Sequence, residues 1–379
     1  MPGASVITGL LFLILFVASP VRAEFSARPV AIDLKFPVAI AFSPDHRLFF
    51  SERFSGNIRV IENPLSDSPR LVPDPVFTFG PVSTFFERGL LGIVLDPGFD
   101  KNGFLYAFYS HKGSGIKTDR YRHRLMRITI KKNKGTDPVA LLDRLPIGSQ
   151  SEFGRGNHNG GSVAFGPDGK LYVSIGDLAK PKNAQDLGTF AGKMLRINPD
   201  GSAPPDNPFY NRKKPDSPRS YVFALGLRNS FDFTFGPDPA GTMRLYATEN
   251  GPSINDEVNI IRRGKNYGWD KKKESGKRGN PKWEDPILVY RRTIAPTGIA
   301  FYQGSVYPEA YRNHLYFADW NDGRIHKIRL GAGGIGPVEV DDEVYQHPEG
   351  IVDLIEGPDG RLYFTTPSGI YRLIHDSES

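Results

Sequence analysis

A short pattern of apolar and polar positions recurs along the whole chain. An apolar residue leads into a Pro-Asp-Gly-like turn, and a strand that begins Leu-Tyr or Leu-Phe follows. Copies begin near residues 42, 95, 165, 235, 301 and 356. Proline presets the first angle of such a turn and glycine accepts a positive φ in it, so each copy predicts a β-hairpin. Residues 57–61 and 171–175 alternate between apolar and polar positions as strands do.

The number of copies predicts the architecture. A small sheet of four strands cannot bury both of its faces alone, but six such sheets stacked around an axis bury them and leave few edges exposed. We therefore expect an all-β protein, a six-bladed β-propeller with four-stranded blades, as a single domain over residues 24–379. A stacked β-helix would need a shorter and more regular period. Short helical turns are expected only near 185–196 and 308–312.

The first 23 residues differ from the rest. Residues 6–18 are apolar and uncharged, and Val21 and Ala23 suit the small-residue rule for signal cleavage. About 13 apolar residues are too few to span a bilayer comfortably. Residues 1–23 are thus predicted to be a signal peptide, with an uncleaved anchor as the alternative. The remainder would be periplasmic or secreted, with no membrane span after cleavage.

Composition narrows the chemistry. The chain has 379 residues and no cysteine, which excludes disulfides, thiolate metal sites and a cysteine nucleophile. The 48 Lys and Arg residues exceed the 42 Asp and Glu residues by only six, and there is no basic stripe beyond short runs such as residues 270–274. We therefore expect no nucleic-acid partner. A P-loop, a Rossmann fingerprint and a Gly-x-Ser-x-Gly motif are all missing from the sequence.

Propellers bind ligands with loops at one end of the axis, so segments that interrupt the repeat are candidate sites. The glycine-rich segment 154–161 holds His158, whose imidazole could serve as a general base. Asp177 follows the next strand and could return across the hairpin to orient the ring. The alternatives are a surface or structural histidine and a turn-capping aspartate.

Three further segments carry polar groups. Arg228 and Asn229 end an apolar run and offer donors to a carboxylate or quinone oxygen, unless Arg228 pairs with a neighbouring blade. Residues 247–259 are rich in oxygen ligands and suit a hard cation such as calcium, although turn hydrogen bonding is the alternative. The segment 87–92 is expected to place Glu87 or Arg88 near the channel. Trp269 is expected in the core.

At these positions the chain resembles the soluble glucose/sorbosone dehydrogenase family, which uses pyrroloquinoline quinone (PQQ). The resemblance runs from about residue 36 to 373. The matching segments are 88–97, 156–173, 191–201, 226–229, 248–252, 256–259 and 266–269. The family fold is a six-bladed propeller, in agreement with the repeat count.

The resemblance implies roles for individual residues. His158 matches the base that takes the proton of the sugar's C1 hydroxyl while hydride passes to the quinone, and Asp177 matches the carboxylate that supports it. Arg228 matches the residue that polarises the quinone, with Asn229 beside it. The carbonyls of Gly251 and Pro252 match the calcium ligands. Thr293 falls where the glucose enzymes contact the cofactor.

The chain departs from this family where charge matters. PQQ carries three carboxylates, and the lysine and arginines that meet them in the glucose enzymes are replaced in segments 320–324 and 350–353. Arg291 and Arg292 stand where they could compensate, and Arg291 is therefore expected among the cofactor-binding residues.

The expected function is a PQQ- and calcium-dependent dehydrogenase that oxidises a small sugar and passes electrons to an external acceptor. The alternatives are a binding module that has lost the quinone site, or a calcium-dependent lactonase. The first would be favoured if Arg291, Arg292 and Arg324 did not face the channel, and the second if side-chain carboxylates converged on an axial ion.

Overall fold

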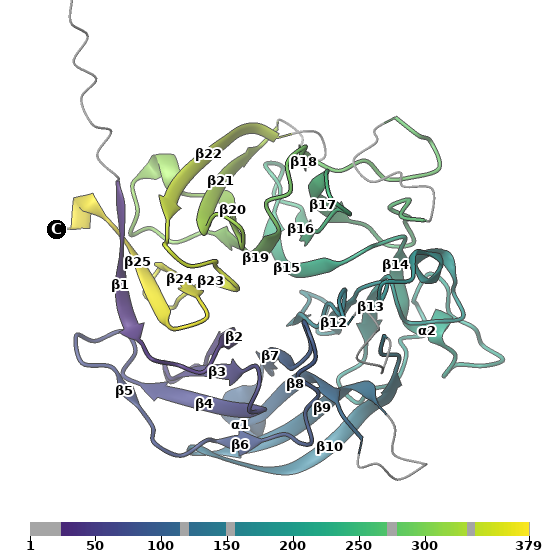
Figure 1. Cartoon of the computed structure of the whole chain (residues 1–379), viewed down its shortest axis with the longest axis horizontal. Coiled ribbons are helices and arrows are strands. Elements are labelled where there is room, and N and C mark those ends of the chain that lie inside the picture. The colour runs from purple at the N-terminus through teal and green to yellow at the C-terminus, as the bar shows by residue number, and fades with distance from the viewer. Residues whose placement is uncertain (1–23, 114–120, 149–155, 271–278, 332–337, 379) are drawn as a thin grey trace, which may run out of the picture.

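The computed structural model describes residues 24–113, 121–148, 156–270, 279–331 and 338–378. Six antiparallel sheets stand around a common centre, which confirms the six-bladed β-propeller (Figure 1). Five sheets have four strands, and the first has a fifth short strand that was not expected. The predicted signal segment, residues 1–23, lies outside the described residues, as does most of the basic run 270–274.

We number the blades in chain order. Blade 1 contains β2 (Pro37–Phe42), β3 (Leu48–Glu52), β4 (Asn57–Glu62), β5 (Arg70–Leu71) and β6 (Phe77–Thr78). Blade 2 contains β7 (Leu90–Leu95), β8 (Phe104–His111), β9 (Arg122–Lys131) and β10 (Lys134–Leu145). Blade 3 contains β11 (Val163–Phe165), β12 (Leu171–Ile175), β13 (Lys193–Ile197) and β14 (Val222–Leu225).

Blades 4 to 6 complete the ring. Blade 4 contains β15 (Ser230–Pro237), β16 (Met243–Glu249), β17 (Asp256–Ile261) and β18 (Leu288–Tyr290). Blade 5 contains β19 (Pro296–Tyr302), β20 (His314–Asp319), β21 (Arg324–Leu330) and β22 (Val338–Gln346). Blade 6 contains β23 (Leu354–Glu356), β24 (Leu362–Thr365), β25 (Ile370–His375) and β1 (Phe25–Ala31).

Each copy of the repeat forms the hairpin between the first two strands of a blade. In blade 3 the turn is closed by a hydrogen bond from Gly166 N to the carbonyl of Lys170 at 2.8 Å. The tyrosine of the Leu-Tyr phrase then donates back to the turn, since Tyr172 OH lies 3.2 Å from Asp168 Oδ2. Blades 2 and 6 repeat this tyrosine-to-aspartate bond. The recurring Asp and Tyr are therefore partners that fix the hairpin.

Helical structure is scarce, as expected, but its places differ in part. The turn near 308–312 is confirmed by the 3₁₀ helix η2 (Glu309–Tyr311). The expected turn over 185–196 is wrong, because the 3₁₀ helix η1 (Pro181–Gln185) ends where it was to begin, and 193–197 is strand β13. The remaining helices are α1 (Phe99–Asn102), α2 (Pro218–Tyr221) and η3 (Asp376–Glu378). None in the described part of the chain has the length and apolarity needed to cross a bilayer.

The core lies between neighbouring blades. Leu, Ile, Val and aromatic side chains on the faces of adjacent sheets pack into continuous clusters, such as the one shared by blades 2 and 3. Side-chain carboxyls also join the innermost strands of adjacent blades. Asp232 on β15 accepts from Ile299 N of β19 at 3.0 Å, and Asp353 accepts from Ile40 N of β2 at 2.8 Å. These bonds hold the inner strands around a central cavity.

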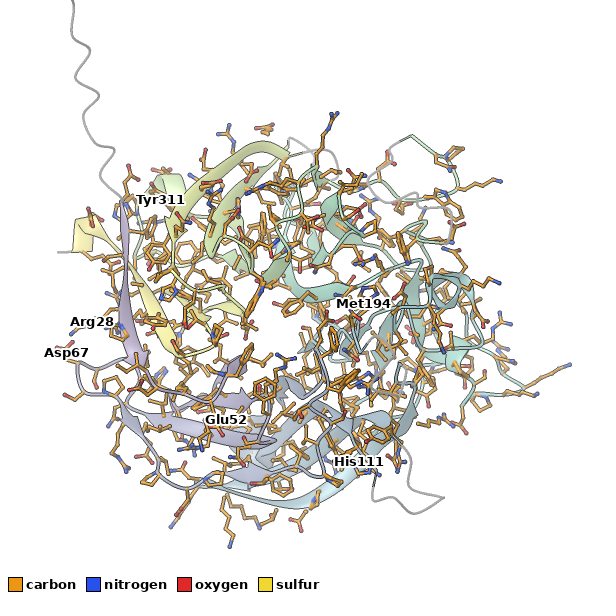
Figure 2. All side chains as sticks on the ribbon, in the orientation of Figure 1. Arg28, Glu52, Asp67, His111, Met194 and Tyr311 are labelled. Carbon is orange, nitrogen blue, oxygen red and sulfur yellow. The ribbon has the colours of Figure 1, made fainter. Side chains whose placement is uncertain are left out.

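The two ends of the described chain meet in blade 6. Strand β1 pairs antiparallel with β25, so that Phe25 lies opposite His375 (Figure 1). At the rim of the ring, Arg28 of β1 forms an ion pair with Asp67 of blade 1 at 2.9 Å (Figure 2). The ring is thus closed by a strand from the beginning of the domain.

Candidate active site

A cavity of about 730 Å³ lies at the centre of the propeller. The inner strands of all six blades supply its apolar wall. Polar side chains enter it from the connecting loops, and those used below are Arg53, Glu87, Asn159, Asn229 and Asn250. Arg53 is the single Lys or Arg among the described residues that line it. The volume falls within the range of small-molecule and cofactor sites.

His158 does not itself line this cavity, but the next residue, Asn159, does, and the backbone of the histidine is strained. Its backbone has a φ of 58°, in the left-handed region, and its N–H donates to Glu87 Oε2 at 2.7 Å. Glycine is required two residues further on, at Gly160, because its φ is 62° and a Cβ there would meet the carbonyl oxygen of Ser174 at 2.6 Å. The glycines of this loop therefore let the histidine backbone pack against the adjoining strand.

Asp177 fixes the imidazole. Its buried carboxylate lies 2.6 Å from His158 Nδ1 and also accepts from Ala179 N and from Trp269 Nε1, both at 2.8 Å. A carboxylate holding Nδ1–H leaves Nε2 as the acceptor nitrogen of a neutral ring. Among the described residues nothing hydrogen-bonds to Nε2 of His158. The pair thus has the arrangement of an oriented general base.

Arg228 joins the same cluster. Its guanidinium carbon lies 5.5 Å from the centre of the Trp269 ring, and Nη1 donates to the carbonyl of Asn250 at 2.7 Å. Its own carbonyl accepts from Asp177 N at 2.7 Å. Nε of Arg228 is buried and without a hydrogen-bond partner. Burial lowers the pKa of this arginine, while the charge of Asp177 opposes the shift.

A buried glutamate holds the Arg228–Asn229 backbone in place. Glu249 Oε1 accepts from the N–H groups of Arg228 and Asn229 at 2.8 and 2.5 Å, and Oε2 accepts from Ser230 Oγ at 2.6 Å. Burial raises the pKa of Glu249 to about 7. Asn229 lines the cavity. Glu249 therefore fixes the backbone of Arg228 and Asn229, two residues predicted to bind the cofactor.

The bend at Gly251 and Pro252 follows directly after Asn250. Asp256 fixes it, because one carboxylate oxygen accepts from Gly251 N at 2.7 Å and the other from the backbone of Ile294 and Ala295 at 2.7 and 2.8 Å. Within the described residues, nothing donates to the carbonyl oxygens of Gly251 and Pro252. The predicted calcium bend is thus pinned to the segment that enters blade 5.

Thr293 lies at the start of that segment. Its carbonyl accepts from Asn321 Nδ2 at 3.0 Å, and its hydroxyl oxygen is buried without a hydrogen-bond partner. Thr293 is not among the residues that line the cavity, although Ala295 is. The structure therefore brings Thr293 close to the bend at Gly251 and Pro252, and its hydroxyl has no hydrogen-bond partner there.

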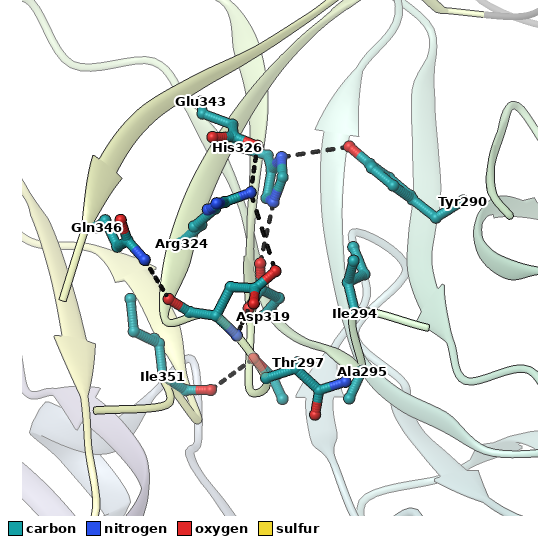
Figure 3. Close-up of polar contacts among 12 residues, drawn as sticks. Tyr290, Ile294, Ala295, Thr297, Asp319, Arg324, His326, Glu343, Gln346 and Ile351 are labelled. Atoms are coloured by element: carbon teal, nitrogen blue, oxygen red, sulfur yellow. Dashed lines mark hydrogen bonds and ion pairs between the residues drawn. The ribbon is translucent and has the colours of Figure 1, made fainter. Parts of the chain in front are cut away.

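The residues that line the cavity do not include Arg291, Arg292 or Arg324. Arg291 is exposed and does not line the cavity. Arg292 is ion-paired with Asp322, and Arg324 donates to Glu343 at 2.7 Å (Figure 3). Residues 291–292 follow β18, the outermost strand of blade 4, and this explains why they reach solvent. Arg291 and Arg292, which were expected to compensate for the missing cations, are thus exposed and are not among the residues that line the cavity.

Three residues at the site were undervalued from sequence. Trp269 is buried, as expected, but it also donates to Asp177 and supports Arg228. Glu87 lines the cavity, and its enclosure by the surrounding protein raises the pKa of its carboxyl against the opposing hydrogen bond from His158 N. Arg53 was missed, although an arginine that directly follows a buried strand and precedes Phe54 was a usable signal.

Two aspartates, Asp232 and Asp353, also line the cavity. Burial raises the pKa of Asp232 to about 6, and the pKa of Asp353 is raised by burial and then by the charge of Asp232. Both bind backbone N–H groups of neighbouring strands. In the parts of the chain that are described, no group of three or more His, Asp or Glu side chains is placed to hold a metal ion.

Comparison with known proteins decides the family. The family model described as glucose/sorbosone dehydrogenase matches residues 34–374. The chain belongs to the glucose/sorbosone dehydrogenase family. The alternatives of a binding module and of a lactonase are not favoured by this membership.

Relatives of this family resemble the chain over nearly its full length. The protein slr1608 of Synechocystis is 30% identical, with 93% of this chain and 86% of that protein covered. The aldose sugar dehydrogenase YliI of Escherichia coli K12 is 28% identical, with 90% of each covered. The PQQ-bound aldose sugar dehydrogenase of Streptomyces coelicolor has a TM-score of 0.75 at 26% identity, covering 93% of this chain and 98% of that one.

Proposed function

We propose that this protein oxidises an aldose sugar at C1 to the lactone, with PQQ as the cofactor and calcium bound beside it. The observation that carries the proposal is the His158–Asp177 pair, which leaves an unbonded imidazole nitrogen beside a cavity of cofactor size. The PQQ-bound Streptomyces neighbour supports the cofactor. Electrons would leave through an external acceptor.

The residues present fit the cofactor. Arg228 has a buried Nε without a partner and Thr293 has a buried hydroxyl without one, and such groups call for a ligand or water. Asn229 adds an amide in the cavity wall. Arg228 and Thr293 do not line the cavity themselves but lie next to Asn229 and near Ala295, which do, and we assign these three polar side chains to the quinone and the neighbouring anionic groups. Arg291 has no part in this assignment.

The bend at Gly251 and Pro252 fits calcium by its donor type. Backbone carbonyl oxygens are ligands that calcium accepts, and the two here have no hydrogen bond within the described residues. Asp256 keeps the bend in one conformation. When bound, PQQ would accept the hydride from the sugar, and calcium would polarise the quinone as a Lewis acid.

The protein's own groups would handle the proton. Nε2 of His158 accepts the proton of the sugar's C1 hydroxyl, and Asp177 stabilises the imidazolium that forms while keeping the ring orientation. Trp269 restrains the second oxygen of Asp177 through its indole N–H. The apolar wall of the inner strands limits water around the reacting atoms.

Reconstitution of the full chain with PQQ and calcium tests the proposal. We expect aldose-dependent reduction of an artificial dye, which chelation of calcium lowers and added calcium restores. His158→Ala should reduce kcat by on the order of 10³-fold because general-base catalysis is lost, and Asp177→Asn by roughly 100-fold. His314→Gln is the matched control, since His314 lies on β20 and bonds only to a nearby carbonyl in the described structure.

The result that contradicts the proposal is equally specific. A wild-type protein that binds PQQ but reduces no dye with any aldose is not a sugar dehydrogenase. Equal kcat values for the wild type and His158→Ala would remove the assigned base. In the first case the binding-module alternative, which the ion pairing of Arg292 and Arg324 away from the cavity favours, becomes the better account.

We also propose an extracytoplasmic location for residues 24–379 as one domain, with residues 1–23 as its cleaved signal. The sequence pattern of residues 6–23 supports this. Fractionation of cells expressing the full chain, followed by N-terminal sequencing of the mature protein, tests the location and the cleavage site together.

A further inference from the structure

Arg53 lines the cavity in a fixed orientation. It follows β3 of blade 1, and its Nε donates to the carbonyl of Arg88 at 3.1 Å. Its Nη2 donates to the carbonyl of Phe86. Two bonds to the backbone of one loop fix both the position and the plane of the guanidinium. The remaining nitrogen, Nη1, has no hydrogen-bond partner among the described residues.

Aromatic rings surround this guanidinium. Its central carbon lies 4.9 Å from the ring centre of Phe36 and 4.7 Å from that of Phe54. Phe36 in turn stacks on Trp320, with ring centres 6.1 Å apart and planes 24° apart. Phe54 is 47% exposed and Trp320 41% exposed, and both Phe36 and Trp320 line the cavity. Exposed rings of this kind beside a cavity favour stacking with a flat ligand.

The charge of Arg53 is not neutralised by a direct partner. No ion pair within 4 Å joins it to a carboxylate in the described residues, whereas Arg292 and Arg324 each have one. Glu87 faces it at longer range, and burial lowers the pKa of Arg53. A partly buried guanidinium with a free nitrogen gains more from an anion than an exposed one does.

We propose that Arg53 binds a carboxylate of the cavity's flat aromatic ligand, in a subsite whose walls are Phe36, Phe54 and Trp320. This deepens the proposed function and rests on it, because the ligand meant is PQQ. The subsite supplies, from blade 1, a cation that Arg291, Arg292 and Arg324 do not bring to the cavity. Planar guanidinium groups pair with carboxylates through two parallel hydrogen bonds or one strong one.

Titration calorimetry with PQQ and calcium tests the subsite. We expect Arg53→Gln to weaken PQQ binding roughly 10- to 100-fold, as the loss of a charge-assisted hydrogen bond does. Arg47→Gln is the matched control, because Arg47 also stacks on a phenylalanine and donates to a backbone carbonyl but does not line the cavity. It should bind PQQ as the wild type does.

A second ligand tests the subsite in the wild type, so that the result does not depend on whether Arg53→Gln folds. The trimethyl ester of PQQ keeps the flat ring and lacks the carboxylates, so the wild type should bind it at least 10-fold more weakly than PQQ. In Arg53→Gln the difference in affinity between acid and ester should be several-fold smaller than in the wild type. Equal binding of PQQ by the wild type and a folded Arg53→Gln, or equal binding of ester and acid by the wild type, would overturn the subsite.

The same measurements separate this inference from the proposed function. PQQ binding that depends on Arg53 without any sugar-dependent dye reduction supports the subsite and contradicts the dehydrogenase. Sugar-dependent dye reduction, with a PQQ affinity that does not depend on Arg53, supports the dehydrogenase and contradicts the subsite. A wild-type protein that does not bind PQQ contradicts both.

Discussion

The buried carboxyl of Glu249 holds the backbone of the candidate active site, and its ionisation affects the free energy of unfolding. Its carboxyl is 4% exposed and accepts three hydrogen bonds from Arg228, Asn229 and Ser230. Burial nevertheless dominates and raises its pKa to about 7 from an ordinary value of 4.5. Between these two values the folded state binds more protons than the unfolded state, so this group makes stability fall as the pH rises.

Glu249→Gln should therefore change the pH dependence of stability. Glutamine keeps the shape and one acceptor oxygen but cannot ionise, so the variant avoids the cost of a buried charge at high pH. Relative to the wild type it should gain about 3 kcal/mol between pH 4.5 and pH 8. Urea unfolding at these two pH values measures the difference. A gap between variant and wild type that is the same at both would contradict the buried-charge argument.

Single residues of the site were predictable to different degrees. His158, Arg228 and the bend at Gly251 stood out because glycines and polar groups interrupt an otherwise regular repeat. The double role of Trp269 and the fixed position of Arg53 depend on contacts between blades that are distant in sequence. No local pattern encodes such contacts, so these roles required the structure.

At the scale of elements, close backbone contact between blades 2 and 3 positions the His158 loop. Gly92 of β7 faces Gly161, and a Cβ on Gly92 would lie 2.1 Å from the carbonyl oxygen of Gly161. The obstructing atom belongs to the backbone, so no side-chain rotation can relieve it. The glycine pair thus allows the histidine loop to lie directly on the inner strand.

Gly92→Ala should destabilise the protein by about 2–3 kcal/mol, since overpacking of a fixed contact forces the backbone to shift. Thermal unfolding should show a melting temperature lower by several degrees. Gly98→Ala is the control, because its Cβ would lie 3.3 Å from a side-chain oxygen of Asp96, and its φ of −100° suits alanine. Equal melting temperatures for the two variants would show that the contact is not tight.

The elements themselves were largely predictable from the repeat. The hairpin turns follow from Pro-Asp-Gly chemistry, and strand 171–175 was predicted with the bounds of β12. The error at 185–196 has a physical cause. Residues 193–197 pair with β12 and β14, and the fully buried Lys193 donates to the carbonyls of Asn183, Ala184 and Ala191 in the preceding loop, so sheet pairing decides the structure of this segment.

At the scale of the whole molecule, the ring depends on one closure. The repeat count predicted six blades, but it did not indicate which strand completes blade 6, because β1 lies before the first copy of the repeat and about 340 residues from β25. Besides its backbone pairing with β25, two kinds of side-chain contact hold β1 in place. The Arg28–Asp67 ion pair is largely exposed, with side chains 53% and 82% accessible, and contributes little. Apolar burial must therefore supply most of what the side chains add to closure.

Phe25 is the residue on which that burial depends. It is 3% exposed and makes edge-to-face contacts with Tyr307, Tyr311 and His375, at ring-centre distances of 5.1, 5.0 and 4.8 Å. Phe25→Ala should cost about 3–5 kcal/mol, as large-to-small core substitutions do, whereas Arg28→Ala should cost less than about 1 kcal/mol. Urea unfolding measures both. If Arg28→Ala proves as costly as Phe25→Ala, the ion pair and not the aromatic cluster closes the ring.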